Sequence, residues 1–226
     1  MSDETNRLVS ARQVQEHQLL YPDERVVAFL AANYPDVDGN FARRALDFGF
    51  GSGRHVRLLL DYGFQAFGID YAQEAVEVAR SLLKDHSHLQ DLRVADLNEK
   101  PYPDNFFDVV ISWGVSFLRP VEEMLRDLRI MNALMKNGSR MIVNFRTKDN
   151  WFYGKGRAVK PDTFLLDHSA GPYSMMCYTF LALEQADELL CKAGFKVDGS
   201  ERIDLWKNNR SEHHSWWIFW ARKGDG

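Results

Sequence analysis

The stretch Ala45-Leu46-Asp47-Phe48-Gly49-Phe50-Gly51-Ser52-Gly53-Arg54 decides the fold, because an apolar run leads through an acid into three glycines at alternate positions. Such glycines let the backbone turn sharply and approach a ligand closely, and a helix behind them points free N–H groups the same way. A second apolar run, 67–69, ends at Asp70, roughly 20 residues after Gly49, where a carboxylate can reach ribose hydroxyls. The two stretches predict a nucleotide-binding site.

The glycine spacing distinguishes between classes of nucleotide. A dinucleotide-binding loop reads G-x-G-x-x-G, whereas this one reads G-x-G-x-G and holds no Lys or Arg to meet a phosphate. It resembles the first motif of the class I S-adenosylmethionine-dependent methyltransferases, whose cofactor has a ribose and an adenine but no phosphate. The resemblance extends over residues 43–145. A plain turn and a dinucleotide-dependent oxidoreductase are the alternatives, and the latter lacks its third glycine.

Composition limits the classes of partner. The 226 residues are 45% hydrophobic and 13% aromatic, which is enough for the core of one large domain. Lys and Arg total 28 against 32 acids, so no basic field would attract nucleic acid or an anionic membrane. The polar start does not resemble a signal peptide and no run approaches 18 apolar residues, which predicts a cytoplasmic protein. Cys177 and Cys191 are expected to be buried free thiols.

Apolar periodicity predicts an α/β fold with a doubly wound, mostly parallel sheet. The expected strands are 44–48, 65–69, 92–95, 107–112 and 139–145, and the expected helices are 24–33, 54–62, 73–85 and 120–136. A further helix over 183–193, a strand from 195 to about 202 and a final strand over 215–221 follow. This ending resembles that of the seven-stranded methyltransferase sheet, whose last strand is antiparallel.

The chain is expected to form a single domain over residues 1–226 with two additions near the site. The first is an N-terminal helical lid at about 8–34. The second is an insertion at about 147–179, which breaks the rhythm of strands and helices. Its aromatic content argues against disorder, so we expect loops with short extended pieces over the carboxyl ends of the strands.

The resemblance implies a set of cofactor-binding residues. Asp47 and the glycines match the loop that faces the methionine part of the cofactor, and Asp70 matches the acid that binds both ribose hydroxyls. Asp96 and Leu97 match an adenine clamp of one carboxylate and one backbone N–H, although Asp96 could instead cap a turn. The implied cofactor residues in the loop are Gly49, Gly51 and Gly53.

Three further residues are candidate cofactor contacts. Ser112 and Trp113 end the fourth strand and would lie beside the methionine part, and Tyr21 could contact the cofactor from the lid. Metal binding is not expected, because the histidine pairs at 86–88 and 213–214 lack ligand spacing and have no acid or cysteine cluster beside them.

The acceptor side of the site is less well defined. Methyl transfer from a sulfonium requires an aligned acceptor and the exclusion of water, and it requires a base only if the acceptor arrives protonated. Arg146 follows the fifth strand, where its guanidinium would suit a carboxylate or phosphate, or would tie down the insertion by a salt bridge. Tyr153 and His168 are candidate bases. His55 is expected to face solvent or cap a helix rather than catalyse.

These residues predict an enzyme that transfers a methyl group from S-adenosylmethionine to oxygen or nitrogen of a small polar metabolite. The acceptor is expected to be anionic, such as an activated or surface sugar. The alternative is a non-catalytic cofactor-binding or complex-forming module of the same fold. In that case the aromatic run 216–220 would be a partner surface, although a buried final strand explains the run more simply.

Overall fold

The computed structural model describes residues 2–35 and 41–224, and a parallel sheet lies at its centre. Five strands lie in the spatial order β3-β2-β1-β4-β5. Their bounds are β1 (Arg44–Phe48), β2 (Gln65–Asp70), β3 (Leu89–Val94), β4 (Phe107–Ser112) and β5 (Met135–Thr147). The strand order reverses at β1, and open α/β sheets bind ligands beside the carboxyl ends of the strands at such a point.

Two long strands at the end of the chain complete the predicted sheet. β10 (Glu212–Lys223) runs antiparallel to β5 on one side and to β9 (Phe195–Lys207) on the other. Seven strands therefore follow the order β3-β2-β1-β4-β5-β10-β9, with β10 alone antiparallel. This arrangement confirms the predicted fold class.

The sheet also has strands that the sequence pattern did not reveal. Residues 147–179 form β6 (Arg157–Lys160), β7 (Thr163–Leu165), the short 3-10 helix η3 (His168–Tyr173) and most of β8 (Cys177–Leu181). β8 pairs in parallel with the end of β5 and antiparallel with β7, so the sheet has ten strands. These strands are only three to five residues long, too short for an alternating pattern to stand out.

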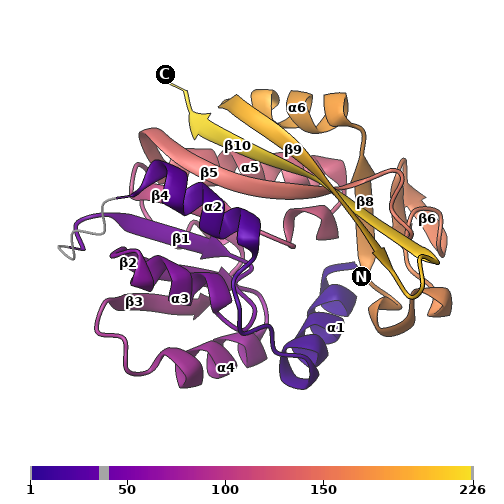
Figure 1. The fold of residues 1–226 in the computed structure, drawn as a ribbon, viewed down its shortest axis with the longest axis horizontal. Coiled ribbons are helices and arrows are strands. Elements are labelled where there is room, and N and C mark those ends of the chain that lie inside the picture. The colour runs from indigo at the N-terminus through magenta and orange to yellow at the C-terminus, as the bar shows by residue number, and fades with distance from the viewer. Residues whose placement is uncertain (1, 36–40, 225–226) are drawn as a thin grey trace.

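Helices cover both faces of the sheet, as Figure 1 shows for α2 and α3 on one side and α5 on the other. One core lies between the sheet and α2 (Glu24–Asn33), α3 (Arg54–Asp61) and α4 (Gln73–Leu83). A second core lies against α5 (Val121–Leu134) and α6 (Leu183–Lys192). Neighbouring residues Ala45 and Leu46 of β1 point into different cores, as the alternation of a strand requires. The central strands β1, β2 and β4 are buried on both faces, which is typical of parallel strands.

The N-terminal segment forms two helices joined by a loop. α1 (Ser2–Glu16) packs against α4 near the carboxyl ends of the strands, whereas α2 belongs to the layer that covers the sheet. Cys177 is buried as expected, whereas Cys191 is exposed. In the described ranges, no helix combines the length and apolar character needed to cross a membrane.

Candidate functional site

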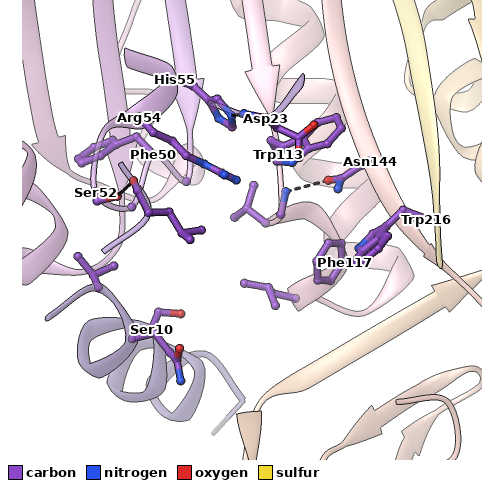
Figure 2. Close-up of a pocket in the computed structure, with 18 of the residues that line it drawn as sticks. Ser10, Asp23, Phe50, Ser52, Arg54, His55, Trp113, Phe117, Asn144 and Trp216 are labelled. Atoms are coloured by element: carbon purple, nitrogen blue, oxygen red, sulfur yellow. Dashed lines mark hydrogen bonds between the residues drawn. The ribbon is translucent and has the colours of Figure 1, made fainter. Parts of the chain in front are cut away.

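A cavity of about 600 Å³ lies at the carboxyl ends of β1, β2, β4 and β5 (Figure 2). The loop that carries the three glycines forms one wall, and the residues that end β4 and β5 form another. α1, the tip of β9 and the insertion cover it. The covering side chains include Gln13, Val14, Tyr173, Met176, Leu205 and Lys207. The sequence motif therefore lies on the wall of a cavity large enough for a small ligand.

The glycines are required for two different reasons. Gly49 has φ +72°, and a Cβ there would lie 2.6 Å from the side chain of Val115, so close packing against the loop after β4 excludes a larger residue. Gly51 has φ +54°, and a Cβ there would face open space, with Val14 of α1 3.9 Å away. Its backbone angle therefore favours glycine, and its free side faces the cavity.

Asp70 joins the two loops that the sequence associates with the nucleotide. Its Oδ2 accepts the N–H of Gly51 at 3.0 Å, and its Oδ1 accepts the N–H of Ala72 at 2.9 Å. Burial raises the pKa of Asp70, and these backbone donors oppose the rise. The carboxylate lines the cavity in a fixed orientation, with lone pairs left to accept further hydrogen bonds.

Asp47 lies outside the cavity lining, behind the glycine loop. It is buried, and its Oδ2 has no hydrogen-bond partner among the described residues. Burial raises its pKa to about 7, although the positive charge of Arg54 lowers it. Asp47 is thus a buried acid that holds its proton to a higher pH than an exposed carboxyl does, and it does not line the cavity.

A second cavity of about 460 Å³ adjoins the first and shares Tyr71, Val115 and Leu118 with it. Asp96 lines this second space. Its carboxylate also accepts the N–H of Asn98 at 2.8 Å, capping the turn that Leu97 begins, and pairs with Arg119 at 2.8 Å.

Leu97 itself is buried in the core under α5. Capping this turn and lining the second cavity are thus compatible for Asp96. The side chain that caps the turn is also the side chain that faces the cavity.

α1 crosses the boundary between the two cavities. The buried Asn6 side chain donates to the carbonyl of Leu118 at 2.7 Å and accepts the N–H of Cys177 at 2.8 Å. One turn further, Ser10 bonds to the Tyr71 hydroxyl at 2.6 Å. Sequence reasoning missed Asn6, because a single asparagine in a polar, weakly amphipathic helix carries no signal of its partners.

The end of β4 contributes one of its two predicted contacts. Trp113 lines the cavity, but Ser112 is fully buried and its hydroxyl bonds to Ser116 at 2.7 Å. The side chain of Asn144, a residue of β5, accepts the N–H of Gly114 in the loop after β4 at 2.8 Å (Figure 2). Ser112 therefore shapes the exit loop without reaching the cavity.

Arg146 lies in a box of aromatic rings at the end of β5. Its guanidinium carbon is 4.4 Å from the ring centre of Tyr178, 4.6 Å from Phe117, 5.0 Å from Phe152 and 5.4 Å from Trp216.

The side chain is 7% exposed and lines the cavity, and burial lowers its pKa. No carboxylate in the described ranges forms an ion pair with Arg146, and its Nε has no hydrogen-bond partner among these residues. The salt bridge considered from the sequence is thus not present there.

Three other predicted site residues lie outside the cavity. Tyr153 is 40% exposed: its ring packs against Phe164 of β7 and Phe180 of β8, and its hydroxyl donates to Asp162 at 2.8 Å. His168 is exposed at the start of η3. Tyr21 is 84% exposed, and its backbone carbonyl accepts a hydrogen bond from Arg54. None of the three side chains lines the cavity.

His55 is buried on the cavity wall rather than facing solvent. Its Nε2 accepts the backbone N–H of Asp23, the residue that caps α2, at 3.2 Å. Burial and the charge of Arg54 lower the pKa of His55 to about 3. The ring is therefore neutral near pH 7 and anchors the loop between α1 and α2.

Comparison with known proteins agrees with this geometry. Residues 46–143 match the sequence family described as a methyltransferase domain. No curated protein matches the chain significantly.

The fold is also that of several solved structures. An S-adenosylmethionine-dependent methyltransferase of Methanosarcina mazei is 18% identical, with a TM-score of 0.71 over 87% of this chain and 98% of that one. The 1,6-didemethyltoxoflavin-N1-methyltransferase of Burkholderia thailandensis, solved with 1,6-didemethyltoxoflavin and S-adenosylhomocysteine, is 19% identical, with a TM-score of 0.71 over 99% and 87%.

A third structure comes from a complex that contains the methyltransferase activator Trm112 of Haloferax volcanii. It is 17% identical, with a TM-score of 0.72 over 100% of this chain and 99% of that one. The family match covers β2 and β4 and most of β1 and β5, and the solved structures share the fold. Residues 46–143 therefore match the methyltransferase-domain family, and the chain shares its fold with S-adenosylmethionine-dependent methyltransferases of known structure.

Proposed function

We propose that this methyltransferase acts on oxygen or nitrogen of a small anionic acceptor, which Arg146 holds in the 600 Å³ cavity. Arg146 is the observation that carries the proposal. A buried cation is costly unless an anion and hydrogen bonds compensate it, and the described chain supplies no paired carboxylate. A planar guanidinium is suited to two-point binding of a carboxylate or phosphate. An activated sugar that carries a phosphate is an acceptor of this class.

The residues present fit S-adenosylmethionine. We assign the ribose hydroxyls to Asp70, whose carboxylate is held at the edge of the cavity by two backbone donors. We assign the adenine to the adjoining cavity, where Asp96 presents an acceptor for an exocyclic amine. The open side of Gly51 faces the methionine part. The cofactor supplies a methyl group on a positively charged sulfur.

The chain's own contribution is alignment and the exclusion of water. α1, β9 and the insertion cover the cavity, and the aromatic box fixes the guanidinium of Arg146. We assign no general-base role to Tyr153, His168 or His55, because Tyr153 and His168 lie outside the cavity and His55 is a weak base with Nε2 already engaged.

The alternative of a complex-forming module was based on an exposed aromatic run at residues 216–220, and the position of this run in the sheet argues against it. The aromatic run 216–220 lies within β10, which is paired on both sides by β5 and β9. Ile218 and Phe219 are buried, and Trp217 donates its ring N–H to the carbonyl of Leu181 at 3.0 Å. The run therefore belongs to the sheet interior rather than to an exposed docking patch.

The proposal is tested with cofactor that carries an isotope-labelled methyl group. A metabolite extract is separated by anion exchange into retained and unretained fractions, each is incubated with the protein, and mass spectrometry detects label. We expect a labelled product in the retained fraction with wild-type protein and none with Arg146→Met. Label only in the unretained fraction would contradict an anionic acceptor. No label in any fraction, from protein that binds S-adenosylhomocysteine, would favour the non-catalytic alternative.

A further inference from the structure

Arg54 is a second guanidinium in the cavity with which no carboxylate of the described residues forms an ion pair. It is the first residue of α3, directly after Gly53, and Figure 2 shows it reaching from the glycine loop into the cavity. Its one hydrogen bond between described residues is a long contact of 3.3 Å from Nη1 to the carbonyl of Tyr21. The sequence motif gives no hint of this role, because Arg54 stands just outside the glycine pattern.

The nearby acids do not neutralise Arg54 directly. Asp23 and Asp47 act on it electrostatically, and burial lowers its pKa despite their negative charge. Neither acid lies within ion-pair distance, since no described carboxylate forms a salt bridge with Arg54. The Asp23 carboxylate instead accepts the N–H of Arg25 at the start of α2, and Asp47 is outside the cavity lining. The guanidinium is thus available to an anion that enters the cavity.

The positions of the two arginines suggest which anion each one binds. Arg54 stands beside the glycine loop, whereas Arg146 stands at the end of β5 among the aromatic rings. A cofactor whose ribose is held by Asp70 brings its methionine part to the glycine loop, and that part ends in a carboxylate. We propose that Arg54 binds the methionine carboxylate of the cofactor, which leaves Arg146 for the acceptor. This assignment rests on the proposed function and adds a cofactor-binding residue to it.

The test compares two ligands that differ in one carboxylate. S-Adenosylhomocysteine and its decarboxylated analogue share the adenine, ribose, sulfur and amine, and calorimetry gives the affinity of each. We expect Arg54→Met to weaken binding of S-adenosylhomocysteine by about tenfold to a hundredfold, because a charge-assisted hydrogen bond is lost. Binding of the analogue should change by less than about threefold, since it has no carboxylate to lose. Arg54→Lys keeps the charge and should give a smaller loss.

Two control variants make the comparison specific. Arg57 is exposed one turn further along α3, where it pairs with Asp61, so Arg57→Met should leave both affinities unchanged. Arg146→Met should also leave both unchanged, because Arg146 is assigned to the acceptor. Thermal unfolding of each variant shows whether the fold is retained.

Several outcomes would overturn the assignment. Equal losses for both ligands in Arg54→Met would mean that Arg54 shapes the cavity without binding the carboxylate. Unchanged affinity for S-adenosylhomocysteine in the same variant would mean that Arg54 makes no contact with the cofactor, while the proposed methyl transfer would stand. Wild-type protein that binds neither ligand would refute the proposed function and this assignment with it.

Discussion

Replacing Asp70 separates its role in binding from its role in the fold. The carboxylate accepts two backbone N–H groups, from Gly51 and Ala72, before any ligand is bound. Ala72 is fully buried, so in Asp70→Ala its N–H would lose its partner at a cost of about 1–3 kcal/mol. Gly51 lines the cavity, so in this variant its N–H can donate a hydrogen bond to water instead. For a chain of this length we therefore expect Asp70→Ala to lower the melting temperature by roughly 2–12 °C.

Asp70→Asn should keep the fold and lose the ligand. One amide oxygen remains to accept the N–H of Ala72, so the melting temperature should stay within about 4 °C of the wild-type value. The amide removes the negative charge and one acceptor from the ribose hydroxyls. Charge-assisted hydrogen bonds contribute about 1.5–3 kcal/mol each, so affinity for S-adenosylhomocysteine should fall at least about tenfold.

Calorimetry and thermal unfolding of both variants give the two quantities separately. Asp61→Ala is the matched control, because Asp61 is an exposed acid at the end of α3 whose ion pair with Arg57 contributes little. If Asp70→Asn binds S-adenosylhomocysteine as tightly as wild-type protein does, Asp70 does not hold the ribose.

Three further changes test other parts of the site. The unfolded chain loses the Asp47 proton near pH 3.8 and the folded chain holds it to about pH 7, so rising pH destabilises the fold across this window. Between pH 5 and pH 8 the melting temperature should therefore fall by at least about 4 °C less in Asp47→Asn than in wild-type protein. Equal falls in the two proteins would contradict the raised pKa of Asp47. Gly51→Val places a branched residue at φ +54° on the cavity wall and should abolish binding of S-adenosylhomocysteine with some loss of stability; normal affinity in calorimetry would undermine the role of the loop. Arg146→Lys keeps the charge without the two-point fork, so once the acceptor is known its KM should rise about tenfold while cofactor affinity and melting temperature change little; parallel losses of all three would indicate a structural role instead.

The sequence predicts the sheet well because its signals are local. β1, β2 and β4 are short apolar runs, and glycines at φ +76° and φ +89° follow α3 and α6 as the pattern indicates. β5 shows why boundaries shift. Its predicted start at 139 follows a turn at Gly138, but the strand begins at Met135. The strand bulges around that turn, so Phe107 pairs with Met135, whereas Val109 pairs with Arg140.

The candidate site could be predicted only where backbone geometry determines it. Asp70 and Asp96 end or follow strands, so their positions relative to the sheet follow from the strand pattern. Tyr153 and His168 belong to a segment whose direction depends on long-range pairing of β7 with β8 and of β8 with β5, which sequence spacing does not encode. The same long-range pairing brings Tyr178 to Arg146, and for this reason the aromatic box could not be read from the sequence.

The way in which α1 is attached to the sheet affects the rates at which ligands enter and leave the cavity. Val9 and Ala11 enter the two cores and Val14 packs against one of them. Asn6 and Ser10 hold the helix by hydrogen bonds to Leu118, Cys177 and Tyr71. A helix fastened in this way can detach while the sheet stays intact, since each such bond contributes only about 1 kcal/mol net in water. Amide hydrogens of α1 should therefore exchange with solvent long before those of β1 and β4, and a bound ligand should slow the exchange in α1 alone.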